Sequence, residues 1–106
     1  FSPQVVFEDP VGSAPKQGLE AVHKSWDNSF KPDRRWTLHP QQVVGGGLEA
    51  AVVMRNEGDL AGQRARVDSI EVFRVDSAGL IIHVRAFFEQ PTDFALSDYF
   101  TPDRSN

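Results

Sequence analysis

Apolar and polar residues alternate along most of this chain, which is the pattern of half-buried strands. The alternation predicts five strands, over residues 4–7, 36–44, 48–55, 63–76 and 80–89. Short turn sequences join the last four of these strands, so we expect them to form an antiparallel meander. Pro40 has no backbone N–H to donate, which favours an edge position or a bulge for the second strand.

One helix is predicted over residues 19–30, where apolar side chains recur at spacings of three and four along one stripe. The stripe consists of Leu19, Val22, Trp26 and Phe30. Residues 9–18 contain two prolines and two glycines and predict a loop, and residues 92–100 predict a short helix or an irregular tail. A helix packed on an antiparallel meander is an α+β fold, in which a curved sheet can wrap a pocket.

Length, charge and composition restrict the possible functions. A chain of 106 residues with 40% hydrophobic content is expected to form one domain over residues 1–106. Its net charge of -4 argues against nucleic acid or an anionic membrane as a partner, and its apolar runs are too short to span a membrane. The absence of cysteine excludes disulfides and suits a cytoplasmic location. The three histidines fall on different elements, so no metal site is expected.

The strand predicted over residues 63–76 carries an unusual acid. Glu71 shares a face with Val67 and Phe73, and that face has no basic residue. Burial there should raise the pKa of Glu71, so that the carboxyl group stays protonated and can donate a hydrogen bond. The alternative is a twist or bulge that lets Glu71 reach water or an arginine.

The opposite face of the same sheet mixes arginines with apolar residues. The apolar members are Ile70, Val72, Ile81 and Phe87. Arginines on this face are expected to be solvated, while the apolar residues favour burial by a second subunit.

A second acid, Asp9, ends the first predicted strand and precedes Pro10. The stiff Asp-Pro step would hold the carboxylate at the mouth of a pocket, whereas the structural alternative is a turn-starting aspartate. Glu8 should point to the other side of the strand, into solvent.

Three segments together resemble the ketosteroid isomerases of the NTF2-like superfamily: FEDPVGSAPKQG with the helix after it, IEVFRVDSAGLI and VRAFFE. The resemblance spans about residues 6–89. It implies a conical, strongly curved antiparallel sheet closed by helices over a deep apolar pocket, and a homodimer. It also implies that Asp9 is the general base and that Glu71 donates to an oxyanion together with a tyrosine from an N-terminal helix.

The chain departs from that family at two places. No tyrosine precedes Asp9, so the family's N-terminal helical segment is expected to be missing, and the helix offers the indole N–H of Trp26 where the family often has a supporting tyrosine. Glu71 stands where the family usually has aspartate and is longer by one methylene.

The resemblance implies a shift of the double bond in a 3-oxo-Δ5-steroid, a small apolar substrate, with no cofactor and no metal. The residues expected to line the substrate pocket are Trp26, Met54, Val67, Phe73, Val84, Ala86 and Phe88. Two other functions stay open. One is a non-catalytic module that binds small apolar ligands, and the other is a cyclase or hydratase of the same superfamily.

Overall fold

The computed structural model describes residues 1–89, except for the side chains of residues 28, 29 and 60. Its one α-helix, α1, spans Leu19–Ser29, close to the predicted bounds. The strands are β1 (Val6–Glu8), β2 (Lys16–Gln17), β3 (Arg34–Gly46), β4 (Glu49–Leu60), β5 (Gln63–Val75) and β6 (Ile81–Phe88). The tail prediction for residues 92–100 lies outside the described residues.

All six strands form one sheet in the order β2-β1-β6-β5-β4-β3. Strands β3 to β6 make the predicted antiparallel meander. β1 pairs parallel with β6, with Phe7 opposite Val84, so the sheet is mixed and not purely antiparallel. β2 lies inside the segment predicted to be a loop, where two residues pair with β1. Neither pairing has a local sequence signal, because both depend on where distant segments meet.

β4 extends five residues past the predicted end at Arg55. The sequence from Asn56 to Asp59 has the composition of a turn, but in the structure it stays paired with both β3 and β5. Gly58 fits this strand because a Cβ there would lie 2.9 Å from the ring of Trp36. The turn prediction was therefore wrong at a position where the glycine makes room for an indole. The prediction for Pro40 is confirmed, since β3 is an edge strand and its register shifts between Pro40 and Gln42.

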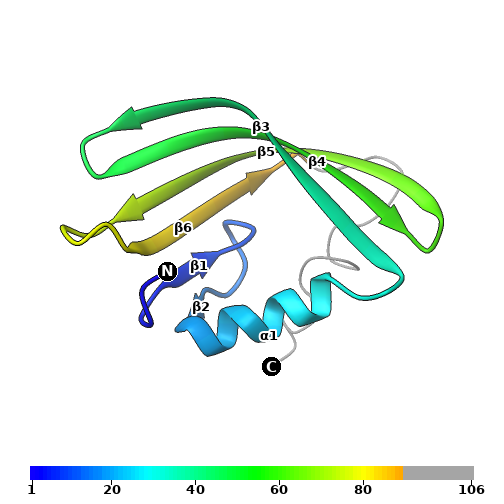
Figure 1. Cartoon of the computed structure of the whole chain (residues 1–106), viewed down its shortest axis with the longest axis horizontal. Helices are drawn as coiled ribbons and strands as arrows, with labels where there is room; N and C mark the ends of the chain where they lie inside the picture. The colour runs from blue at the N-terminus through cyan, green and yellow to red at the C-terminus, as the bar shows by residue number, and fades with distance from the viewer. Residues whose placement is uncertain (90–106) are drawn as a thin grey trace.

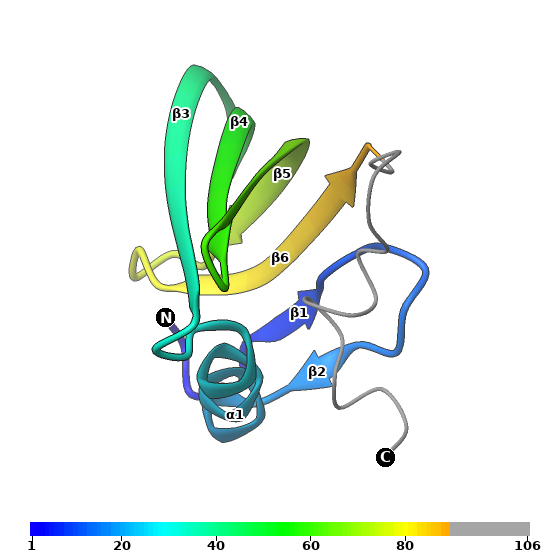
Figure 2. The same cartoon turned by 90° about the vertical axis from the view of Figure 1, so that its right-hand side faces the viewer.

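The meander arches over α1, which lies below the sheet beside β1 and β2 (Figure 1). Figure 2 shows the same arrangement from the side, with β3, β4 and β5 rising away from the helix. A buried cluster of Val5, Phe7, Val22 and Val84 joins β1, α1 and β6, and Trp26 and Phe73 pack against it. This cluster fixes the helix under one part of the arch. Within residues 1–89, no helix has the length and apolar character that crossing a membrane would require.

The outer face of the sheet carries a row of apolar side chains that we call the outer apolar row. Val53, Ile70 and Phe87 lie directly opposite one another on β4, β5 and β6. Each remains substantially exposed, at 39%, 49% and 42% respectively. The predicted orientation of the two sheet faces is thus correct for Ile70 and Phe87. Ile81 was also predicted on the outer face, but it packs against the buried cluster around Val84, next to the register shift between Arg74 and Val75.

Candidate active site

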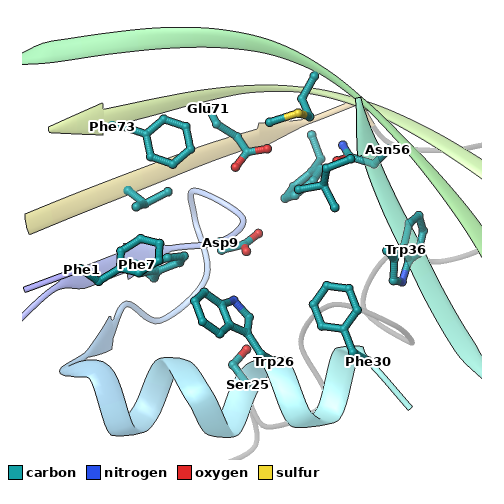
Figure 3. A pocket seen from close by; sticks show the side chains of 14 residues that line it. Phe1, Phe7, Asp9, Ser25, Trp26, Phe30, Trp36, Asn56, Glu71 and Phe73 are labelled. Atoms are coloured by element: carbon teal, nitrogen blue, oxygen red, sulfur yellow. The ribbon is translucent and has the colours of Figure 1, made fainter. Parts of the chain in front are cut away.

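A pocket of about 330 Å³ lies between the inner face of the sheet and α1 (Figure 3). Its walls are largely aromatic, and two carboxyl groups enter it. The lining residues are Phe1, Phe7, Asp9, Ser25, Trp26, Phe30, Trp36, Leu38, Met54, Asn56, Glu71, Phe73, Val84 and Phe88. Its size and its few convergent polar groups are typical of a site for a small, mainly apolar molecule.

Asp9 directly follows β1 and points into the pocket (Figure 3). The loop behind it is held in place because the Val11 N–H donates to the Ala86 carbonyl at 2.7 Å, and the Ser13 hydroxyl donates to the Pro10 carbonyl at 2.6 Å. Oδ1 of Asp9 is buried and has no hydrogen-bond partner among the described residues. Burial raises the pKa of Asp9 from 3.8 to about 6, against the opposing effect of the Lys16 charge.

Glu71 enters the pocket from β5, and its direct neighbours across the sheet are Val52 on β4 and Ala86 on β6. Burial in this apolar row raises the pKa of Glu71, and the nearby Asp9 carboxylate raises it further. The Ser69 hydroxyl, 3.3 Å from Oε2 of Glu71, acts in the opposite direction because it can donate to the charged form.

The two acids are suited to different protonation states. Two carboxylates that share an apolar site cannot both ionise without a large cost, so ionisation of one favours the neutral form of the other. With a pKa of about 6, Asp9 is mostly ionised at neutral pH, and its charge raises the pKa of Glu71. The pocket therefore holds a base of raised pKa beside a second acid whose neutral form the charge of that base favours.

The structure brings most of the predicted pocket residues together. Trp26, Met54, Phe73, Val84 and Phe88 line the cavity with the two acids.

Val67 and Ala86 face the same side of the sheet, but they do not line this cavity. At 2% and 1% exposure they are covered by other side chains. Their role as substrate contacts stays a prediction, and in the structure they belong to the buried interior of the sheet.

Several lining residues were not predicted. Trp36 and Leu38 lie on the inner face of β3, and the same alternation that revealed Glu71 could have identified them. Asn56 was predicted to lie in a turn, so its orientation toward the pocket was not predicted. Phe1 precedes the first strand, where periodicity carries no signal. Phe30, the C-cap of α1, was predicted on the apolar stripe of the helix but not as a pocket residue.

Glu8 is not solvated as predicted. Its Oε2 lies 2.7 Å from Nε2 of His83 and 3.3 Å from Nε of Arg85, and its side chain is 24% exposed. These contacts tie the end of β1 to β6 on the outer face, one residue before Asp9. Glu8 therefore helps to hold the strand that delivers the pocket aspartate. In the part of the chain that the structure describes, no three His, Asp or Glu side chains group as metal ligands would.

Residues 1–84 match the sequence model of the SnoaL-like domain. The chain belongs to this family. This SnoaL-like domain has the predicted NTF2-like cone fold, which the solved structures similar to it share.

One similar structure is the Δ5-3-ketosteroid isomerase from Mycobacterium sp., at 24% identity and a TM-score of 0.73 over 84% of this chain and 75% of that one. Another is Rv0760c from Mycobacterium tuberculosis in complex with estradiol-17β-hemisuccinate, with the same identity, coverage and TM-score. A third is SalBIII, an epoxide hydrolase/cyclase-like enzyme of salinomycin pyran-ring formation, at 23% identity and a TM-score of 0.73 over 84% of this chain and 72% of that one. At these identities the similarity establishes the fold, and the reaction has to be argued from the site.

Proposed function

We propose that this SnoaL-like domain is a steroid Δ-isomerase in which Asp9 is the general base and Glu71 is the neutral oxyanion donor. The observation that carries the proposal is the pair of carboxyl groups in one apolar pocket, with the pKa of Asp9 raised to about 6 and that of Glu71 also raised. A base of this pKa is ionised at neutral pH and still binds a proton well enough to take one from carbon.

In the proposed reaction, the Asp9 carboxylate removes a proton from C4 of a 3-oxo-Δ5-steroid. The electrons of the C–H bond form a C3=C4 bond, and the carbonyl electrons move to the oxygen on C3. The O–H of Glu71 donates to this dienolate oxygen and stabilises its charge. Asp9 then returns the same proton to C6, and the double bond moves from C5=C6 to C4=C5. The proton and the electrons balance without a cofactor or a metal.

The shape and chemistry of the pocket support this substrate class. Aromatic side chains from β1, α1, β3 and β5 surround the two acids and provide flat apolar walls for a fused-ring skeleton (Figure 3). The similar fold of a ketosteroid isomerase, and of a protein in complex with a steroid ester, supports the same class. Trp26 adds an indole N–H to the pocket, and we propose it as a second donor to the steroid oxygen.

The same pair of acids would also serve a cyclase or hydratase, and the similar SalBIII is a cyclase-like enzyme. Such an enzyme would need Asp9 but would leave the steroid unchanged. A module that only binds apolar ligands would bind the steroid equally well with or without the Asp9 charge.

The test is the rise in ultraviolet absorbance of the conjugated enone when the protein meets a 3-oxo-Δ5-steroid. Asp9→Asn should lower kcat by several orders of magnitude, and Glu71→Gln by about 10²- to 10³-fold, the usual cost of losing one oxyanion donor. Matched controls are Asp27→Asn and Glu20→Gln on the exposed side of α1, which should retain activity. A wild-type protein that binds the steroid without converting it would refute the isomerase.

A further inference from the structure

A short chain of hydrogen bonds runs from β4 to Glu71 through the interior of the sheet. Nδ2 of Asn56 donates to the Val67 carbonyl at 3.0 Å and to the Ser69 hydroxyl at 2.9 Å. The Ser69 hydroxyl lies 3.3 Å from Oε2 of Glu71. Asn56 and Ser69 are each 4% exposed, so water competes little for these bonds.

The first member of the chain fixes its direction. The Val67 carbonyl can only accept, so the nitrogen of the Asn56 amide must face it, and the oxygen cannot. The same nitrogen donates to the Ser69 oxygen, which leaves the hydroxyl proton of Ser69 to be donated onward. Its acceptor is Oε2 of Glu71. When Glu71 is neutral, its own proton therefore belongs on Oε1.

We propose that Asn56 and Ser69 form a positioning relay that holds Oε2 of Glu71 as an acceptor and so assigns the proton to Oε1, the oxygen left free for a ligand. The inference rests on the proposed function, because it names the residues that make Glu71 an oriented donor. Ser69 is a positioning residue, and Asn56 acts on Glu71 through it.

The Glu71 side chain is long enough to need a partner that holds its carboxyl group in one orientation. Glutamate has one more rotatable bond than aspartate, so its carboxyl group samples more orientations unless something holds it. Both cross-strand neighbours, Val52 and Ala86, are apolar and cannot do so. The Ser69 hydroxyl, two residues earlier on the same face of β5, is the hydrogen-bond donor to Glu71 within the described residues.

Stability alone does not require this polar pair. Replacing both partners of a buried hydrogen bond by apolar groups of similar shape costs little, and the neighbouring inward residues Val52, Met54 and Val67 are already apolar. The pair instead maintains a fixed direction of donation toward the pocket acid.

The decisive experiment is a pH titration of the side-chain carboxyl carbon of Glu71 by ¹³C NMR, which does not depend on turnover. The hydroxyl of Ser69 favours the ionised form of Glu71, so Ser69→Ala should move the titration midpoint upward. Ser69→Thr keeps a hydroxyl and should stay near the wild type, as should Ser77→Ala in the exposed turn. Asp9 is the carboxylate that acts on Glu71 and must be followed in the same spectra, with Lys16 close to it.

Kinetics supply the second arm. Ser69→Ala should lower kcat for the steroid about tenfold with little change in KM, and should cause no further loss in a Glu71→Gln background. An unchanged Glu71 midpoint in Ser69→Ala, or an equal loss of kcat in both backgrounds, would overturn the relay. If Ser69→Ala does not fold, Asn56→Ala replaces it, because it removes the amide that directs the hydroxyl proton of Ser69 toward Glu71 and should raise the same midpoint. A higher Glu71 midpoint in Ser69→Ala, together with a wild type that does not convert the steroid, would refute the isomerase and leave the relay standing.

Discussion

The replacement of Asp9 by asparagine should stabilise this protein at neutral pH while removing its activity. The pKa of Asp9 is raised from 3.8 to about 6 in the folded state because burial penalises the charged form. The folded state therefore binds this proton more tightly than the unfolded state. Below pH 3.8 the group is protonated in both states and costs nothing. As the pH rises toward 6 the unfolded state releases its proton first and stability falls, and above pH 6 the cost is complete.

At 1.36 kcal/mol per pH unit, the Asp9 charge costs about 3 kcal/mol of folding free energy at pH 7.5 and about 1 kcal/mol at pH 4.5. Asparagine is always neutral and avoids this cost. Urea unfolding should therefore show a gain for Asp9→Asn that grows by about 2 kcal/mol between the two pH values. At pH 7.5 the gain corresponds to a midpoint higher by roughly 1 to 3 M urea.

The difference between the variant and the wild type reports on Asp9 together with its coupling to Glu71, whose pKa the Asp9 charge raises. Asp27→Asn on the exposed surface of α1 is the control and should show no gain that varies with pH. A difference between Asp9→Asn and wild type that stays constant from pH 4.5 to 7.5 would mean that the Asp9 charge is not buried as described. Asp9 would then not be a base of raised pKa.

Three further predictions concern the surroundings of the pocket and the outer face. Lys16→Met removes a charge that lowers the pKa of Asp9. The apparent pKa on the acid side of the pH profile of kcat/KM, expected near 6, should therefore rise, and an unchanged value would contradict this. Gly58→Ala places a Cβ 2.9 Å from the Trp36 ring, so it should cost about 1 to 3 kcal/mol in urea unfolding and alter tryptophan fluorescence, whereas a silent variant would show that the indole yields freely. We also propose that a second copy covers the outer apolar row, so light scattering should find a dimer that Ile70→Asp converts to monomers; equal masses for both proteins would rule this out.

The alternation of residues was enough to predict the meander and the inward position of Glu71, because a period of two assigns each residue of a regular strand to one face. The same rule failed at Asn56, where turn-like composition concealed a continuing strand. There the packing of Trp36 on Gly58 and the pairing with two neighbouring strands outweighed local preference. Because the predicted strand ended at Arg55, the hydrogen bond from Asn56 to Ser69 was not predicted either.

Long-range pairing limited the prediction of the site more than side-chain chemistry did. The sequence offered Asp9 and Glu71 as two separate acids, and only the resemblance to a family connected them. The connection is physical in the structure: β1 pairs parallel with β6, and the Val11 N–H binds the carbonyl of Ala86, the residue directly across from Glu71. A parallel pairing between distant segments has no local signal in the sequence.

The burial of Asp9 also bears on the choice between an enzyme and a module that only binds ligands. The charge costs about 3 kcal/mol at neutral pH, and Oδ1 gains no hydrogen bond from the described residues in return. The contacts of Glu8 with His83 and Arg85 hold the residue that precedes Asp9 in place. A pocket built only for apolar ligands would be more stable, and equally apolar, with a neutral side chain there. A buried carboxylate held at such a cost is best explained by a reaction that uses its charge.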